Sequence, residues 1–403
     1  MNKGCRRDHG FLYTGDVHHW WVRFTIFDHP LYVDHWVKTS IVVTVVDEIH
    51  PPLSASNQTP QLDIIGGAGT YSAVGARLVS PPPSSSKVGW IVDCGTDFPT
   101  ELHQTIANWE TGALMRERDG LTTRGWNGYG ANEHRGESQV VVDSSYHTTY
   151  TRNDVDKSVA FKYLTPKLRL TAEDLTPELL CSQSFHLISS PLRCIELVNG
   201  ILERRAKSSP DLPRPLLIWE PVPDLCVKSE LDNTYEAIKH LDVISPNHAE
   251  LTSLFGIEAT TASGDVNRTG VEDCSRKLVS AVSSTKRELH VVVRSGKDGC
   301  YVRSSKGDTA GTWIPAYHAN NPVKVVDPTG GGNGFLGGFA IGLVRTSDPI
   351  QAAVWGSVSA SLCIEQVGMP VLERIANGGE TWNGVDVQKR LKQFQEGCFK
   401  QEG

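Results

Sequence analysis

The chain has 403 residues, 39% hydrophobic and 21% charged, so its composition predicts a globular protein with room for one large domain or two ordinary ones. Its formal charge is -7 and its isoelectric point is near 6.1, which argues against a nucleic-acid partner reached through a broad basic surface. No apolar run is long enough to span a membrane. Nine scattered cysteines include no Cys-x-x-Cys pair, and the basic N-terminus lacks the apolar segment of a signal peptide. We therefore expect a reduced, cytoplasmic protein.

Short apolar runs alternate with helix-like segments along most of the chain. The helix-like segments include "PELLCSQ", "CIELVNGILERRA" and "HAELTSLFG". Near-continuous apolar strands separated by helices are typical of a mostly parallel sheet covered on both faces, so the predicted fold class is α/β. The predicted strands are Ser40–Ile49, Val88–Gly95, Phe185–Ser190, Pro215–Pro221, Leu241–Asn247 and Leu289–Gly296.

Two regions interrupt this alternation. Residues 1–38 are rich in Trp and His without a clear period, and we expect them to be a poorly ordered extension. Residues 136–159 are polar and β-prone, as in a hairpin or flexible insertion. The remaining chain, 39–395, is predicted to form the folded domain, followed by a tail at 396–403.

The stretch "VVDPTGGGNGFLGGF" at 325–339 carries the strongest functional signal. We expect an apolar strand to end at Asp327, ahead of three glycines and a small-residue helix. Gly330, Gly331 and Gly332 would point backbone N–H groups inward at a helix N-terminus, which suits a phosphate. A tight turn with close helix packing is the alternative. Asn333 occupies the first helical turn, where an amide cannot act as a base.

Other nucleotide motifs fit the sequence less well. "GNGFLG" at 332–337 matches the dinucleotide pattern G-x-G-x-x-G, but the following residues predict two helices and no strand. The chain contains neither a G-x-x-x-x-G-K-[ST] phosphate loop nor a protein-kinase H-R-D motif.

Five blocks in order resemble the PfkB/ribokinase family of carbohydrate kinases. "DPTGGGN" is similar to the family signature D-T-x-G-A-G-D, and "GGAGTYSAVGARL" to its N-terminal substrate motif. "SPNHAELTSLFG" resembles the N-x-x-E block, "VVVRSGKDGCYV" the strand-turn-strand at the nucleotide, and "AAVWGSVSASLCIEQVG" the helix beside the adenine. The resemblance covers roughly 40–368 and is closest to the fungal maintenance-of-killer branch.

The resemblance implies a large, mostly parallel sheet between helices, with a small β lid built from 47–66 and 121–163. It also implies ATP and Mg²⁺ as cofactors and a small hydroxylated substrate, sugar or nucleoside-like. Glu250 would hold Mg²⁺ indirectly through water. The nucleotide-binding residues carried over are Asn247, Glu250, Ser295, Gly296, Gly299, Asp327, Ser357 and Ser361, and the substrate-binding residues are Asp47, Gly66, Gly67 and Tyr71.

Each of these roles has a structural alternative. Asn247 and Glu250 also fit a helix capping box, Ser295 to Gly299 a plain hairpin turn, and Ser357 and Ser361 a small-residue packing seam. The family's catalytic Asp is replaced by Asn333.

Two functions remain open on the sequence. One is an ATP-dependent kinase, slowed because a general base contributes about 10² to 10⁴ in rate. The other is an inactive nucleotide-binding relative that acts through a protein partner, and a homodimer is also open. Replacing Asn333 by Asp is expected to raise the rate by about 10². We expect no nucleic acid or membrane as partner.

Overall fold

Six strands form the central sheet of the computed structural model, in the order β14-β13-β12-β11-β10-β9. The four strands from β9 to β12 run parallel, whereas β13 and β14 are antiparallel additions at one edge. The sequence correctly predicts the parallel strands, whose bounds are β9 (Ser184–Ser189), β10 (Leu216–Pro221), β11 (Val243–Ile244) and β12 (His290–Arg294), followed by β13 (Cys300–Ser304) and β14 (Thr312–Ile314).

The structure describes residues 45–50, 61–128, 140–141, 149–150, 161–166, 168–285, 287–307, 310–375 and 378–399. All of them belong to one unit, Trp36–Gly403. The expected extension at 1–38 and most of the expected insertion at 136–159 lie outside these residues.

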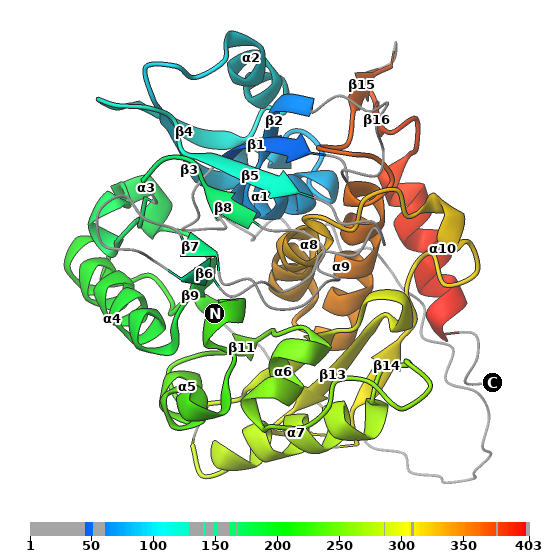
Figure 1. The fold of residues 1–403 in the computed structure, drawn as a ribbon. Helices are drawn as coiled ribbons and strands as arrows, with labels where there is room; N and C mark the ends of the chain where they lie inside the picture. The colour runs from blue at the N-terminus through cyan, green and yellow to red at the C-terminus, as the bar shows by residue number, and fades with distance from the viewer. Residues whose placement is uncertain are drawn as a thin grey trace, which may run out of the picture. The chain divides into compact units, whose positions relative to one another are not determined.

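Helices cover both faces of the central sheet (Figure 1). Along β10, Leu217 and Trp219 join one buried cluster and Ile218 joins the other, as expected for a strand whose side chains alternate between two faces. The first cluster includes side chains of α4 (Pro191–Ser208), α5 (Leu231–Ile238) and α7 (Arg268–Ala281), and the second those of α1 (Ala68–Leu78), α8 (Gly331–Thr346) and α9 (Pro349–Cys363).

A second sheet of four strands has the order β2-β1-β5-β8. Its strands come from the segments expected to build the small β lid, and Asp47 pairs with Ile64 and with Gly125. Asp47 therefore lies inside a strand of this sheet that continues to His50. The strands are β1 (Val45–His50), β2 (Gln61–Gly66), β5 (Arg124–Gly128) and β8 (Phe161–Tyr163).

The remaining strands form separate pairs. They are β3 (Gly89–Cys94) with β4 (Gly112–Glu117), β6 (Val140–Val141) with β7 (Thr149–Tyr150), and β15 (Leu372–Arg374) with β16 (Glu380–Trp382). The other α-helices in the described ranges are α2 (Thr100–Asn108), α3 (Pro177–Leu180), α6 (His248–Leu254) and α10 (Val387–Phe399).

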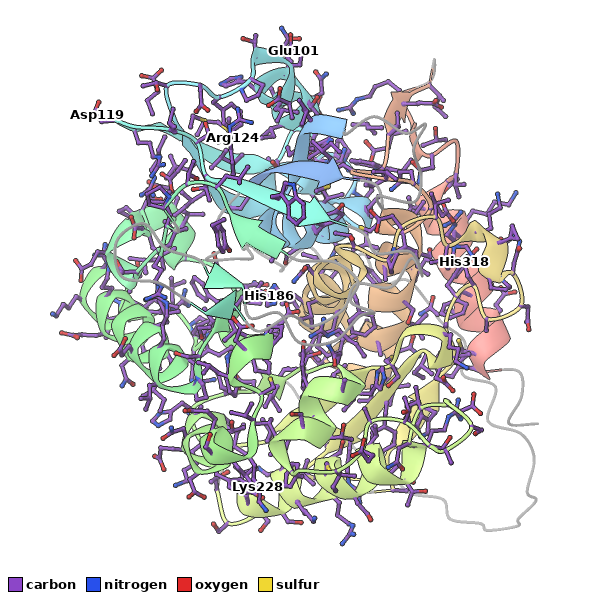
Figure 2. The ribbon with its side chains drawn as sticks, in the orientation of Figure 1. Glu101, Asp119, Arg124, His186, Lys228 and His318 are labelled. Atoms are coloured by element: carbon purple, nitrogen blue, oxygen red, sulfur yellow. The ribbon has the colours of Figure 1, made fainter. Side chains whose placement is uncertain are left out.

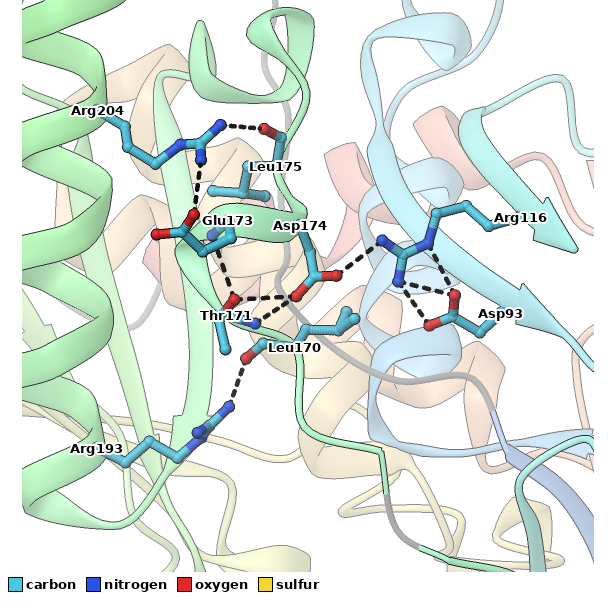
Figure 3. Close-up of polar contacts among 9 residues, drawn as sticks. All are labelled: Asp93, Arg116, Leu170, Thr171, Glu173, Asp174, Leu175, Arg193 and Arg204. Carbon is cyan, nitrogen blue, oxygen red and sulfur yellow. Dashed lines mark hydrogen bonds and ion pairs between the residues drawn. The ribbon is translucent and has the colours of Figure 1, made fainter. Parts of the chain in front are cut away.

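An arginine joins the β3–β4 pair to the segment that leads into the central sheet (Figure 3). Arg116 on β4 donates from Nε to Asp93 on β3 at 2.8 Å and from Nη1 to Asp174 at 2.8 Å. Asp174 also accepts from the backbone N–H of Thr171 at 2.7 Å in a capping box. Arg116 thus links two parts of the fold that are distant in sequence.

Helices α1, α8 and α9 pack through small residues that let their backbones approach closely. A Cβ on Gly337 would lie 1.9 Å from the carbonyl oxygen of Ser72, and one on Gly75 would lie 2.0 Å from that of Gly334. Only glycine fits at such positions, because the neighbouring atom is backbone and cannot move alone. This seam fixes α1 against the start of α8.

We predict that Gly337→Ala lowers the free energy of unfolding by about 1–3 kcal/mol, the usual cost of an overpacked core. The matched control is Gly397→Ala in α10, where a new Cβ meets nothing within 4 Å. Urea denaturation measures both variants. Equal midpoints for G337A and the wild type would contradict the tight α1–α8 contact.

The structure differs from the sequence-based expectation at residues 325–327 and at the C-terminal boundary. Residues 325–327 are not a strand: a short 3₁₀ turn, Pro322–Lys324, precedes them, and Val325 and Val326 are exposed. Apolar residues alone did not distinguish a strand from an exposed loop. Helix α10 continues to Phe399, so the boundary expected at 395 falls inside a helix.

Within the described ranges no helix has the length and apolarity needed to cross a membrane, and the cysteines there are free.

Candidate functional site

The three glycines form a turn at the start of helix α8, as the sequence predicts. Gly330 has a left-handed backbone with φ of 75°, and the helix begins at Gly331. The Gly331 N–H donates to Pro328 O at 3.2 Å. Gly332 and Asn333 stay partly exposed in the first turn, where helix N–H groups lack intrahelical acceptors. The turn can therefore present donors to an anion.

The residues expected to bind substrate meet this turn. Gly66 ends β2, and Gly67, with φ of 85°, precedes α1. Tyr71, one turn into α1, is buried, and a Cβ on Gly330 would lie 2.2 Å from the Cγ of its ring. The structure thus places the Gly66–Tyr71 segment directly against the glycine turn.

Asn333 contacts a buried carboxylate that the sequence interpretation did not include. Its Nδ2 donates to Oε2 of Glu220 at 2.9 Å. Glu220 lies near the end of β10 and is 7% exposed. An ionised carboxylate only accepts hydrogen bonds, so the amide nitrogen must face it and Oδ1 of Asn333 must face away.

Arg294, the last residue of β12, neutralises this carboxylate. Its Nη1 lies 2.8 Å from Oε1 of Glu220, and its Nη2 donates to Ser245 O at 2.9 Å and lies 3.5 Å from Oε2 of Glu250. A Cβ on Gly332 would lie 2.1 Å from Nη1. The guanidinium therefore borders the glycine turn and touches two carboxylates.

His186 completes the group from β9, inside the fold between the sheet and the α1–α8 seam (Figure 2). Its Nε2 lies 2.9 Å from Oε2 of Glu220, and its Nδ1 lies 2.8 Å from Oγ of Ser72. Because the carboxylate accepts, Nε2 carries the proton and Nδ1 accepts from Ser72. This order resembles a Ser-His-acid triad, but Ser72 and His186 are both 0% exposed, so no substrate reaches them.

The pKa of Glu220 lies below its usual value. Burial alone would raise the pKa, but the charge of Arg294 and the hydrogen bonds from His186 and Asn333 outweigh it. Glu220 is therefore a stable anion at neutral pH and a poor proton acceptor.

Asn247 and Glu250 form the capping box that the sequence offered as their alternative role. Oδ1 of Asn247 accepts from the Glu250 N–H at 2.8 Å, and Oε2 of Glu250 accepts from the Asn247 N–H at 2.7 Å. The same oxygen faces Arg294. The carboxylate expected to hold Mg²⁺ through water thus has a backbone donor and a guanidinium as partners.

Ser295, Gly296 and Gly299 form a tight turn between β12 and β13. The Ser295 N–H donates to Gly299 O at 2.7 Å, and both glycines have positive φ. A Cβ on Gly299 would lie 2.0 Å from Ile314 O. The hairpin alternative accounts for these residues, and their contact with a nucleotide stays a prediction.

Ser357, Ser361 and Asp327 make contacts within the protein. Ser357 donates to Ala353 O and Ser361 to Val358 O, both inside α9. Asp327 accepts from the Thr329 N–H at 2.9 Å, which shapes the entry to the glycine turn. The small-residue packing alternative thus describes both serines.

A cavity of about 470 Å³ lies beside residues 317–324, the segment that precedes Asp327 in the sequence. Glu365 accepts from Arg390 at 2.8 Å in its wall and lies 3.1 Å from His318, labelled in Figure 2. None of the residues predicted from sequence lines it. Its lining residues are Tyr317, His318, Asn321, Lys324, Glu365, Asn383, Val385, Arg390, Gln393 and Phe394.

Glu220, Arg294 and His186 are the site residues that sequence interpretation missed. The sequence carries a signal for Glu220 and Arg294, because "PLLIWEP" and "LHVVVRSG" each place a charged residue near the end of an apolar strand. Charged residues at the carboxyl ends of parallel strands meet at one edge of the sheet, here on β10 and β12 with β11 between them. His186 has no such signal, since it lies inside a buried strand.

Comparison with known proteins agrees with this fold. Residues 221–371 match the model of the pfkB family carbohydrate kinases. Protein MAK32 of Saccharomyces cerevisiae is 33% identical over 345 residues, which cover 82% of this chain and 85% of that protein.

Two solved structures are similar in fold. Adenosine kinase from Sinorhizobium meliloti matches with a TM-score of 0.59 and 15% identity, covering 89% of this chain and 99% of that one. Ribokinase from Cryptococcus neoformans, solved in complex with ADP, matches with a TM-score of 0.53 and 16% identity, covering 83% and 94%.

Proposed function

Because this chain belongs to the PfkB family of carbohydrate kinases, in the branch of MAK32, we propose that it binds ATP and transfers its γ-phosphoryl group slowly to a small hydroxylated substrate. The observation that carries the proposal is the glycine turn at the start of α8, partly exposed beside Arg294. The ADP complex of the ribokinase with the same fold is consistent with a nucleotide as ligand.

The glycine turn would stabilise the phosphoryl group, and the side chain of Asn333 would orient the substrate hydroxyl. N–H groups of Gly332 and Asn333 stabilise the charge on the phosphoryl group, the larger part of catalysis in such transfers. Oδ1 of Asn333, directed away from Glu220, accepts a hydrogen bond from the substrate hydroxyl and orients it. The hydroxyl oxygen bonds to phosphorus as the bond to ADP breaks, and the hydroxyl proton leaves to water or to the phosphoryl group. Without a base this step is slow.

A second function is favoured by the same contact. Asn333 accepts no proton, and the neighbouring Glu220 is fully engaged with Arg294 and His186. A nucleotide-binding protein without turnover, acting through a protein partner, satisfies these observations as well. The two functions differ in turnover and agree in nucleotide binding.

Calorimetry with ATP and ADP tests the shared part, and a screen of sugars, polyols and nucleosides for phosphorylation separates the two functions. We predict that Gly332→Ala weakens ADP binding by about tenfold or more, because the new Cβ would lie 2.1 Å from Nη1 of Arg294 and must displace the guanidinium or the turn. Misplacing one charge-assisted hydrogen bond costs about 1.5–3 kcal/mol. Gly397→Ala, with open space around its new Cβ, is the control. ADP binding that is equally tight in G332A would place the nucleotide elsewhere.

A further inference from the structure

The residues that converge on Arg294 do not fit a protein-bound Mg²⁺. The ion demands octahedral oxygen ligands, and Glu220 and Glu250 are the carboxylates paired with Arg294 beside the glycine turn. Glu220 already takes three donors, from His186, Asn333 and Arg294. Glu250 takes the Asn247 N–H. Within the described part of the chain, no three His, Cys, Asp or Glu side chains are grouped to hold a metal.

We propose that Arg294 is the resident cation of this site, holding the place between Glu220 and Glu250 that a divalent ion would need, so that nucleotide binding does not depend on divalent metal. The geometry supports this, because one guanidinium reaches Glu220 through Nη1 and Glu250 through Nη2. Arg suits the task, since its planar fork remains charged when buried.

The net charge of the site is consistent with an uncharged residue at position 333 when Arg294 replaces a divalent ion. Two carboxylates, one guanidinium and a neutral amide at 333 have a net formal charge of minus one. Two carboxylates, a divalent ion and an aspartate at 333 have the same net charge. Asn333 and Arg294 thus match each other in charge. A guanidinium carries one positive charge where a divalent ion carries two, so it balances one carboxylate fewer.

Arg294 is also placed to meet a phosphate. Its Nη1 lies where a side chain on Gly332 would begin, next to the N–H groups of the turn. A guanidinium has five N–H donors: Nη2 faces Ser245 and Glu250, Nη1 faces Glu220, and Nε is buried with no partner among the described residues, so the second N–H of Nη1 is the donor left for a phosphate. This step rests on the proposed function, since it takes the turn as the phosphate site.

Two measurements on the wild-type protein test the proposal. Calorimetry with ADP in MgCl₂ or in EDTA is expected to give dissociation constants within about tenfold of each other. Titration with Mn²⁺, followed by electron paramagnetic resonance, is expected to show no ion bound by the free protein. ADP binding only with Mg²⁺, or one tightly bound Mn²⁺ per chain, would overturn the proposal and leave the proposed function standing. No ADP binding in either buffer would overturn the proposed function, and with it the metal-independent binding.

Variants of Arg294 separate its charge from its shape. Arg294→Met leaves the two carboxylates without a cation and is expected to bind one Mn²⁺ per chain and to need Mg²⁺ for ADP. Arg294→Lys keeps the charge and is expected to exclude Mn²⁺ as the wild type does. Arg268→Met is the control, because Arg268 pairs with Asp298 at the surface. Mn²⁺ binding by R294K as tight as by R294M would show that the positive charge of residue 294 does not exclude the metal.

Discussion

Replacing Glu220 by Gln is expected to lower the free energy of unfolding by about 3–5 kcal/mol, the cost of leaving a buried charge without its partner. Glu220 is 7% exposed, and Arg294 has its shortest ion pair with it at 2.8 Å. Glutamine keeps the volume but replaces one acceptor oxygen by an NH₂ donor, so the change removes the charge and one of the two acceptor positions that Arg294, His186 and Asn333 use. Urea denaturation of the two proteins measures the difference.

The matched control is Glu203→Gln, which removes a carboxylate from an exposed pair with Lys207. Exposed pairs contribute little, so its unfolding midpoint should not move. A loss below about 1 kcal/mol in E220Q, similar to an exposed ion pair, would show that the cluster does not depend on this charge.

The difference in stability between the wild type and Glu220→Gln is expected to depend on pH. Because the pKa of Glu220 in the folded protein is lowered from its ordinary value of 4.5, its stabilisation is complete above that pH. It is lost as the pH falls through the lower folded pKa. The difference in stability between wild type and E220Q should therefore be constant near neutral pH and shrink in acid. A difference that grows on acidification would reverse the sign assigned to this pKa.

The sequence predicts the fold well where the pattern is local. The apolar runs around Phe185, Leu217 and Val292 are strands of the central sheet, and the turn at Gly330 starts a helix as expected. It fails at Val325 and Val326, because an apolar pair cannot reveal that no sheet neighbour is available. The order in which strands pair depends on contacts distant in sequence.

The site is predictable in its backbone and not in its side-chain partners. The Gly330–Gly332 turn follows from local sequence, whereas the contact between Asn333 and Glu220 joins residues 113 positions apart. From sequence, Asn333 looked like a lost base. In the structure it is the donor that a buried carboxylate requires, which changes what Asn333→Asp alone can achieve.

The second prediction follows from that contact. Asn333→Asp places two carboxylates about as close as the present 2.9 Å between Asn333 Nδ2 and Glu220 Oε2. Like charges at this distance raise the pKa of one of them, so the pair shares a proton and the new carboxylate is a poor base. N333D alone is expected to gain little rate and to lose about 1–3 kcal/mol of stability, since a buried acceptor loses its donor.

Exchanging the carboxylate and the amide between positions 220 and 333 should restore both the stability and an ionised base. In Glu220→Gln with Asn333→Asp, the glutamine amide can donate to the new carboxylate, and the cluster keeps one carboxylate for Arg294. The double variant is expected to be more stable than the sum of the single changes by about 1 kcal/mol or more, the signature of directly coupled residues. With a substrate from the phosphorylation screen, it should turn over about 10² faster than the wild type, because the carboxylate introduced at position 333 is then an ionised base.

A double-mutant cycle in urea measures the coupling, and mass spectrometry of the assayed wild type confirms that Asn333, which precedes Gly334, has not deamidated. Arg268→Met combined with Asn333→Asp is the control pair, since Arg268 contacts Asp298 at the surface and should show no coupling to residue 333. If N333D alone reaches the rate of the double variant, Glu220 does not suppress the new acid, and the contact between the two side chains is not what sets the chemistry of this site.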